Sequence, residues 1–384
     1  MGGGGFRFHL SPPTSEHPRE EQRNSLSTDT LTDQDLIEGW GALEEEANNR
    51  KYHYYRPLSD AAKSTVSEAQ DQQRVFTGIE AFDTETRGIG RGHLMNIVGY
   101  SHSGKTLLLL KMLMENKGKR IAYFCPDETA SLVLVKLTAI TQGIGARDLE
   151  SRIASGDSEA IHLLTETATT IFPHLAVFDG GLTPTKMEEA YTELVEEVWG
   201  TDDDAFCIVD YVDLMDECGE VPQKFNWLKA FGKSHNIPMI LIHQTSRTAG
   251  SAGRAMTLSS GNFGGEQHAT FQIGVRRKKN SIMAELAEAR SKAQPNAERI
   301  GELQHELLVA EYTITLNLVK NKRPGGACVD EIDFELDVAT GAMYPLADGE
   351  MPYQWQQRHS AYAKQVAAAP AVTWEEQEIA YESF

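Results

Sequence analysis

The stretch from Leu94 to Met114, LMNIVGYSHSGKTLLLLKMLM, decides the fold class of this chain. Its first part, Leu94 to Val98, is a short apolar run that predicts a buried strand, and Thr106 to Met114 is a Leu- and Lys-rich run that predicts a helix. Between them, Gly99 to Thr106 fits the pattern GxxxxGK[ST]. A strand, a glycine-containing loop and a helix in this order predict a phosphate-binding loop (P-loop).

The residue types of this loop suit a nucleoside triphosphate. Glycines let backbone N–H groups curl around phosphate oxygens, and the helix N-terminus adds positive potential. We expect Lys105 to reach the β- and γ-phosphates and the Thr106 hydroxyl to bind Mg²⁺, so the expected cofactors are ATP and Mg²⁺. The cofactor-binding residues predicted by the pattern are Gly99, Ser101, His102, Ser103, Gly104, Lys105 and Thr106.

Apolar strand candidates alternate with helical stretches along the rest of the middle of the chain. The further strands are predicted at Arg120 to Cys125, Leu175 to Phe178, Phe206 to Asp210, Met239 to His243, Gln272 to Val275 and Thr313 to Val319. The helices between them are predicted at Ala130 to Thr141, Thr185 to Trp199 and Lys224 to His235. This alternation predicts an α/β fold, with a mostly parallel sheet covered by helices on both faces.

Three regions organise the chain. Residues 1–70 are polar and predicted to be mostly flexible, with Leu31 to Glu46 at helical spacing as either a docking helix or a lone surface helix. Residues 71–346 are predicted to form the ATPase domain. Within them, the charged stretches of residues 281–310 flank Pro295 and predict an inserted helical hairpin. Residues 347–384 are predicted to form a flexible acidic tail.

Acidic residues at strand ends supply the chemistry that a P-loop needs. Asp210 ends a buried strand and is predicted to lie at the magnesium site. We place the strand at Ile121 to Cys125 next to the P-loop strand, which would point Glu128 at the γ-phosphate as the base that activates water, with Asp127 as the competitor. Gln244 follows another buried strand and can hydrogen-bond the γ-phosphate.

Composition limits the classes of partner. The chain has 384 residues and a formal net charge of −20 at pH 7, which argues against a uniformly basic surface that coats nucleic acid. Any contact with nucleic acid must therefore be local. No apolar run approaches the length of a membrane span, and the N-terminus lacks a secretory pattern, so we expect a cytoplasmic protein without a membrane partner. The four cysteines lack zinc-site spacing.

An ordered series of motifs resembles the ATPase domain of DnaB-type replicative helicases, and more distantly RadA and RecA. Asp210 to Met215 (DYVDLM) is similar to that family's DYLQLM segment, and His243 to Arg247 (HQTSR) is similar to its SQLNR segment. The series also includes Thr77-Gly78-Ile79, Gly90 to Leu94, Trp227 to Phe231, Gly265 to Ala269 and Lys320 to Gly326. The resemblance implies a RecA-like P-loop core and covers about two thirds of the chain.

The same resemblance implies how subunits and DNA are contacted. Family members act as hexamers on single-stranded DNA, with a lysine and an arginine finger reaching the neighbouring subunit's ATP. By position, Lys320 is the lysine and Lys322 or Arg323 the finger, although their spacing differs by one from the family's. The loops of the central channel imply DNA contacts from Arg247, Arg254 and Lys279.

The sequence thus predicts a hexameric ATP-dependent DNA helicase of a bacterial or phage-infected cell, with other replisome proteins as candidate partners. The N-terminal domain with which the family binds primase has no counterpart in the polar residues 1–70. Two alternatives stay open: a RadA/RecA-like recombinase or mediator that forms filaments on DNA, and a KaiC-like regulatory ATPase that binds no DNA.

Overall fold

The computed structural model describes residues 74–245, 256–258, 267–292, 294, 296–347, 350–353 and 357, together with Leu58 and Ala62. The chain separates into two compact units, Met1–Gln70 and Asp71–Phe384, and the fold below belongs to the second. The helix predicted at Leu31 to Glu46 lies outside the described residues. Arg247 and Arg254 also lie outside them.

The described residues form one mixed sheet, with strand order β3-β2-β4-β5-β1-β6-β7-β8-β9. All pairings from β3 through β6 are parallel, and β7, β8 and β9 are antiparallel to their neighbours, as the prediction of a mostly parallel sheet requires. The strands are β1 Leu94–Gly99, β2 Ile121–Phe124, β3 Leu175–Phe178, β4 Phe206–Asp210, β5 Met239–Gln244, β6 Phe271–Arg276, β7 Thr313–Asn321, β8 Val329–Leu336 and β9 Met343–Pro345.

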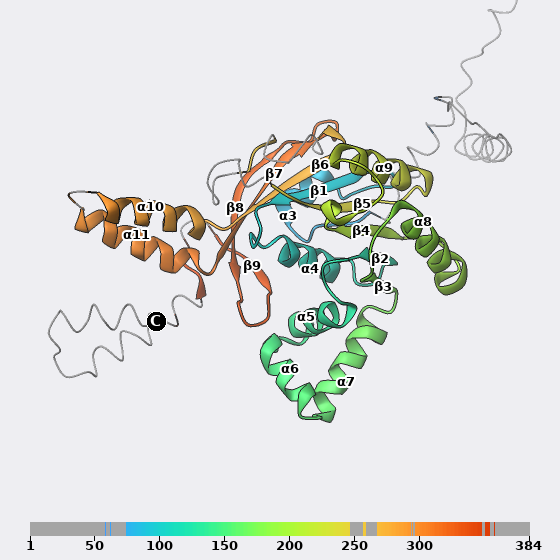
Figure 1. Ribbon diagram of the computed structural model, residues 1–384, viewed down its shortest axis with the longest axis horizontal. Helices are drawn as coiled ribbons and strands as arrows, with labels where there is room; N and C mark the ends of the chain where they lie inside the picture. Colours follow the sequence, from blue (N-terminus) through green and yellow to red (C-terminus); the bar gives the residue numbers. More distant parts are fainter. Residues whose placement is uncertain are drawn as a thin grey trace, which may run out of the picture. The chain divides into compact units, whose positions relative to one another are not determined.

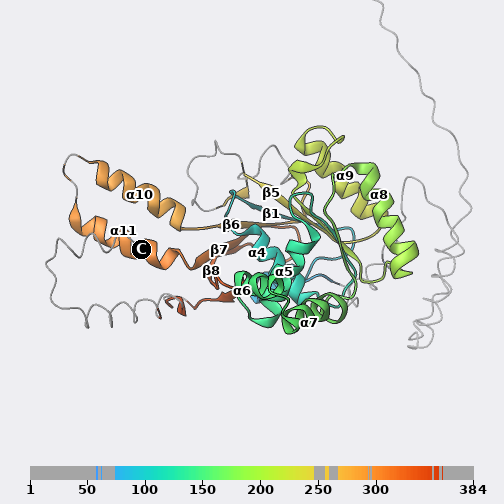
Figure 2. The same ribbon diagram turned by 60° about the horizontal axis from the view of Figure 1, so that its bottom comes forward.

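Helices cover both faces of this sheet, as predicted (Figure 1 and Figure 2). The helices are α3 Glu80–Thr86, α4 Lys105–Glu115, α5 Ala130–Gln142, α6 Ala146–Ala154, α7 Ser158–Glu166, α8 Pro184–Glu193, α9 Val221–Ser234, α10 Lys279–Ser291 and α11 Ala297–Ala310. Short π-helical turns extend α7 and α8, at Thr167–Ile171 and Leu194–Trp199, and a 3₁₀ turn, η3, spans Val212–Leu214.

Alternating strand residues divide the core into two apolar layers. In β4, Phe206 and Ile208 pack in the layer of α4 and α5, whereas Cys207 and Val209 pack in the layer of α8 and α9. This division follows from the two-residue period of a strand, whose side chains point to opposite faces in turn. A strand buried on both faces has a continuous apolar sequence, which explains why these strands are unbroken apolar runs.

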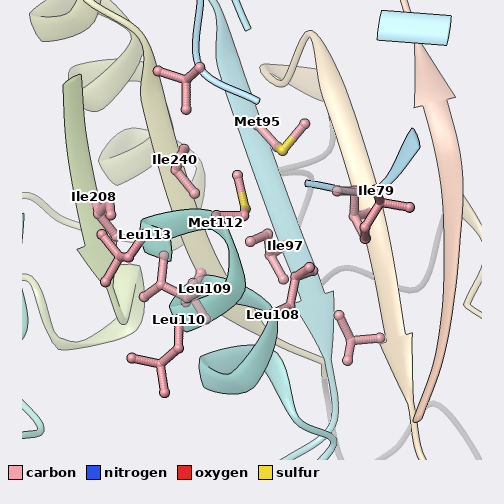
Figure 3. Packing of buried hydrophobic residues seen from close by; sticks show 14 of the residues in the cluster. Ile79, Met95, Ile97, Leu108, Leu109, Leu110, Met112, Leu113, Ile208 and Ile240 are labelled. Atoms are coloured by element: carbon pink, nitrogen blue, oxygen red, sulfur yellow. The ribbon is translucent and has the colours of Figure 1, made fainter. Parts of the chain in front are cut away.

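Helix α4 fixes the P-loop to the centre of the sheet. Its Leu109, Met112 and Leu113 are buried against Ile97 of β1 and Ile240 of β5 (Figure 3). Burying one such side chain contributes about 1.5–3 kcal/mol, so this contact firmly anchors the start of the helix beside the end of β1.

The predicted helical hairpin is confirmed between β6 and β7. Helices α10 and α11 run side by side away from the sheet (Figure 1 and Figure 2). They share a small apolar cluster that contains Leu286, Ala289 and Leu303. The side chain of Asn296 caps α11 by accepting hydrogen bonds from the amides of Glu298 and Arg299.

The lateral order of the strands differs from the prediction in one respect that bears on the site. The strand at Ile121 to Cys125 does not neighbour the P-loop strand, because β4 and β5 lie between β2 and β1. The premise that placed Glu128 is therefore wrong. The strand–helix alternation predicts parallel direction, but it does not determine which strands are neighbours.

Candidate nucleotide-binding and hydrolysis site

The P-loop joins β1 to α4 through a tight turn. Gly104 has a positive φ of 101° and caps α4, and His102 also has a positive φ of 58°. A Cβ atom on Gly99 would lie 2.5 Å from Ser103 Oγ and closer still to the carbonyl oxygen of Val275. Glycine is therefore required at position 99 by space and at position 104 by backbone conformation.

Lys105 lies in the first turn of α4 with its side chain folded back onto the loop. Its Nζ donates hydrogen bonds to the carbonyl oxygens of Gly99 at 3.0 Å and Tyr100 at 2.7 Å. Burial lowers the pKa of Lys105 to about 8, against the opposing charges of Asp210 and Asp213. The side chain still carries its proton at neutral pH, so phosphate oxygens can replace the two carbonyls as its acceptors.

Asp210 ends β4 and is 2% exposed. Its Oδ2 accepts a hydrogen bond from the Tyr123 hydroxyl at 3.1 Å, and its Oδ1 is buried without a hydrogen-bond partner among the described residues. Burial, aided by the charge of Glu128, raises the pKa of Asp210 to about 7 despite the favourable Tyr123 hydrogen bond and Lys105 charge. A buried carboxylate with one unsatisfied oxygen beside a P-loop suits an Mg²⁺ ion or its bound water.

Asp210→Asn is expected to stabilise the fold at alkaline pH. Because the folded-state pKa of about 7 lies above the ordinary value of 3.8, the native state holds more protons between these values, and the free energy of unfolding falls as pH rises through that window. The amide cannot ionise, so the variant should gain on the order of 1–3 kcal/mol at pH 8. Thermal melts from pH 4 to 8 measure this, and the gain should vanish near pH 4. A variant less stable than wild type at pH 8 would contradict it.

Glu128 follows β2 and still lies near Asp210, because β2 pairs with β4 rather than with β1. Its Oε1 forms an ion pair with Lys136 Nζ of α5 at 2.5 Å, and its Oε2 is buried without a hydrogen-bond partner among the described residues. The ion pair orients the carboxylate and leaves one oxygen free to accept a proton. The competitor Asp127 is exposed, although its charge also acts on Asp210.

Gln244 lies beside the P-loop. Strands β5 and β1 are neighbours, Gln244 pairs in register with Gly99, and the amide of Thr245 donates to the Gly99 carbonyl at 3.3 Å. Two residues that were not predicted from the sequence support this position: His243 Nδ1 lies 3.0 Å from Asp213 Oδ2. An acidic residue three positions after Asp210 and a histidine directly before Gln244 were the available signals.

The basic residues near the end of β7 lie at the other edge of the sheet from the P-loop. Lys320 pairs with Gln272 at the start of β6, whereas Gly99 pairs with Val275 near its end. Arg323 is held by its own chain, since its Nε donates to the Thr86 carbonyl at 3.0 Å. Lys322 is exposed. Of the two predicted finger residues, the geometry thus favours Lys322 for reaching another subunit.

Lys279 opens α10 at the same edge of the sheet as the P-loop, because β6 runs parallel to β1 and leads into α10. Ser103 Oγ is a further buried oxygen of the P-loop that has no hydrogen-bond partner among the described residues. In those residues no group of three or more His, Cys, Asp or Glu side chains could hold a metal. Mg²⁺ with a nucleotide needs no such group, since phosphates and water supply most of its ligands. No helix in the same residues is long and apolar enough to cross a membrane.

Comparison with known proteins places this geometry in a family. Residues 75–258 match the family model of the DnaB-like helicase C-terminal domain. A search of curated proteins finds no significant sequence match.

The fold is similar to a DnaB-like replicative helicase, solved in a study of its interactions with primase, at 15% identity and a TM-score of 0.55, covering 82% of this chain and 72% of that chain. It is also similar to a second solved structure, an ATPase domain, at 15% identity and a TM-score of 0.57, covering 77% of this chain and 100% of that chain. These structures show the RecA-like fold. Residues 75–258 therefore belong to the DnaB-like helicase C-terminal domain family, and the chain carries a DnaB-type ATPase domain.

Proposed function

We propose that this chain hydrolyses ATP with Mg²⁺ and uses the reaction to move along single-stranded DNA as a ring of subunits. The observation that supports hydrolysis most directly is the gathering of Lys105, Asp210 and Glu128 beside the P-loop, where both carboxylates present a buried oxygen without a partner among the described residues. The family match of residues 75–258 supports the motor activity.

Each residue of the site has a defined part in the proposed reaction. The P-loop amides and Lys105 bind the phosphates, and Thr106 together with Asp210, directly or through water, would hold Mg²⁺. Mg²⁺ supplies neutralising charge to the β- and γ-phosphates when bound. Glu128 accepts the proton of the attacking water through Oε2 while Lys136 holds Oε1. Gln244 contacts the γ-phosphate and passes its loss to the residues that follow β5.

Glu128→Gln is expected to retain ATP binding and lose hydrolysis by about 100-fold or more, because the amide can accept a hydrogen bond from water but cannot take its proton. The matched control is Asp127→Asn, which changes the neighbouring exposed carboxylate in the same way. Phosphate release and fluorescent-nucleotide binding measure the two properties. An active Glu128→Gln protein beside an inactive Asp127→Asn protein would move the base by one residue.

The shared ATP site follows from where the basic residues lie. Lys320 and Lys322 cannot complete the nucleotide site of their own subunit from the opposite edge of the sheet, so we propose that they act on the ATP of a neighbouring copy. Such a head-to-tail contact repeats around a closed ring, and we propose the hexamer of the resembling family.

DNA contacts are proposed for Arg247, Arg254 and Lys279. Each phosphate contact that is lost should lower the salt slope of single-stranded DNA binding by about one unit, so an unchanged slope in Arg254→Ala would remove that residue from the interface. A forked duplex with one labelled strand tests the motor itself: ATP-dependent release of the strand is expected. Strand pairing without separation would indicate a recombinase, and hydrolysis that ignores DNA would indicate a regulatory ATPase.

A further inference from the structure

Asp213 and His243 form a buried link between the turn after β4 and the end of β5. His243 has no solvent exposure, and its Nδ1 lies 3.0 Å from Asp213 Oδ2. The same carboxylate oxygen accepts a longer hydrogen bond, of 3.4 Å, from the amide of Gln244. Phe225 of α9 contacts the imidazole edge-on, with ring centroids 5.5 Å apart. One carboxylate thus holds the side chain of one residue and the backbone of the next.

The link carries charge and is braced on its other side. Burial acts to raise the pKa of Asp213, but the hydrogen bond and charge of His243, together with the Gln244 amide, hold that pKa below its ordinary value. The carboxylate is therefore ionised at neutral pH and accepts a proton from His243 Nδ1, which fixes the orientation of the ring. Lys224 Nζ donates to the Asp213 carbonyl at 2.7 Å and so fixes the backbone of the turn.

The position of the link connects it to the nucleotide. Gln244 pairs with Gly99 across the strand boundary, and the charge of Asp213 raises the pKa of the P-loop residue Lys105 against the effect of burial. The link therefore joins the turn that follows Asp210 to the residue predicted to contact the γ-phosphate. Misplacing such a contact by about 1 Å can lower a rate by about 100-fold.

Both residues depart from the motifs that this chain resembles. Asp213 occupies the position of Gln in DYLQLM, and His243 occupies the position of Ser in SQLNR. The two departures touch each other in the structure. A matched change at two contacting positions indicates that the pair acts as a unit, because neither substitution alone would leave its partner satisfied in a buried site.

We propose that Asp213 and His243 are a positioning pair that holds Gln244 against the γ-phosphate and couples that contact to the turn after Asp210. This inference rests on the proposed ATP hydrolysis and adds to it two residues that touch neither phosphate nor water. The alternative is a structural brace whose loss changes stability alone.

A double-mutant cycle separates the two. His243→Ser and Asp213→Gln are expected each to lower kcat by about 10- to 100-fold, with nucleotide affinity within about threefold of wild type. The double variant, which carries the Gln and Ser of the resembling motifs, is expected to recover to within about threefold of the wild-type kcat. Hydrogen exchange gives a second readout without turnover: the amides of Gln244 and Thr245 should exchange about tenfold faster in either single variant.

The chain offers a matched control and a mild variant. His235 forms a similar pair with Glu188 at 2.7 Å, between α9 and α8 and away from the P-loop, so His235→Ser should leave kcat unchanged. Asp213→Asn removes the charge and keeps an acceptor for His243, so it tests the pair if His243→Ser does not fold. Single variants with wild-type kcat and exchange, or a double variant no better than the product of the singles, would overturn the proposal. Absence of Lys105-dependent hydrolysis in wild type would instead overturn the proposed function.

Discussion

A Lys322→Ala protein is expected to bind ATP normally, to hydrolyse it at least about 100-fold more slowly than wild type, and to regain activity when mixed with Lys105→Ala subunits. Lys322 is exposed at the edge of the sheet opposite the P-loop, so its ammonium can reach only another subunit's triphosphate. The loss of that charge removes stabilisation of the transferring phosphoryl group without touching the subunit's own nucleotide pocket.

The mixing experiment gives this expectation a quantitative form. One type of mixed interface joins the intact P-loop of a Lys322→Ala subunit to the intact finger of a Lys105→Ala subunit. At equal proportions such interfaces amount to about a quarter of the total, so roughly a quarter of wild-type turnover should return if subunits exchange freely. No recovery at any ratio, with exchange verified by labelled subunits, would count against a shared site.

Arg323→Ala is the matched control in that experiment. Its guanidinium is bound to the carbonyl of Thr86 in its own chain, and Asn321 holds the same turn through the carbonyl of Glu85. We therefore expect Arg323→Ala to lower the melting temperature more than the turnover. A dead Arg323→Ala protein that is rescued by mixing, beside an active Lys322→Ala protein, would reassign the finger to Arg323.

Lys105→Ala is expected to lower ATP hydrolysis by about 1000-fold or more while leaving the fold intact, because the ammonium that neutralises the β- and γ-phosphates is lost. The residue is 3% exposed and burial disfavours its charged form, so removal of the side chain should not destabilise the empty protein. Phosphate release and a thermal melt measure the two effects. Lys111→Ala, on the same helix, is the control and should retain turnover.

The local elements of the fold could be predicted because their signals lie within short stretches. The unbroken apolar run at Phe206 to Asp210 gives β4 with the bounds expected, and the pattern from Gly99 to Thr106 gives the P-loop. Helices α3 and α6 were not predicted. They are short and bury few side chains, with Leu149 alone in α6, so neither has a long apolar stripe.

The relations between elements could not be predicted in the same way. The position of β2, separated from β1 by two strands, depends on how crossovers pack, and the sequence pattern carries no signal for it. The ion pair of Glu128 with Lys136 and the hydrogen bond of Asp213 with His243 likewise join residues that only the folded chain brings together. Asp210 was predictable as a strand-end carboxylate, but its raised pKa follows from burial and from Glu128.

Turnover of ATP by the full chain, measured with Mg²⁺ in the presence and absence of single-stranded DNA and beside Lys105→Ala, tests the central claim most directly. The DnaB-type site predicts Mg²⁺-dependent phosphate release that rises when DNA is added and falls to background in the variant. Equal phosphate release by wild type and Lys105→Ala, or none by wild type under any of these conditions, would contradict it.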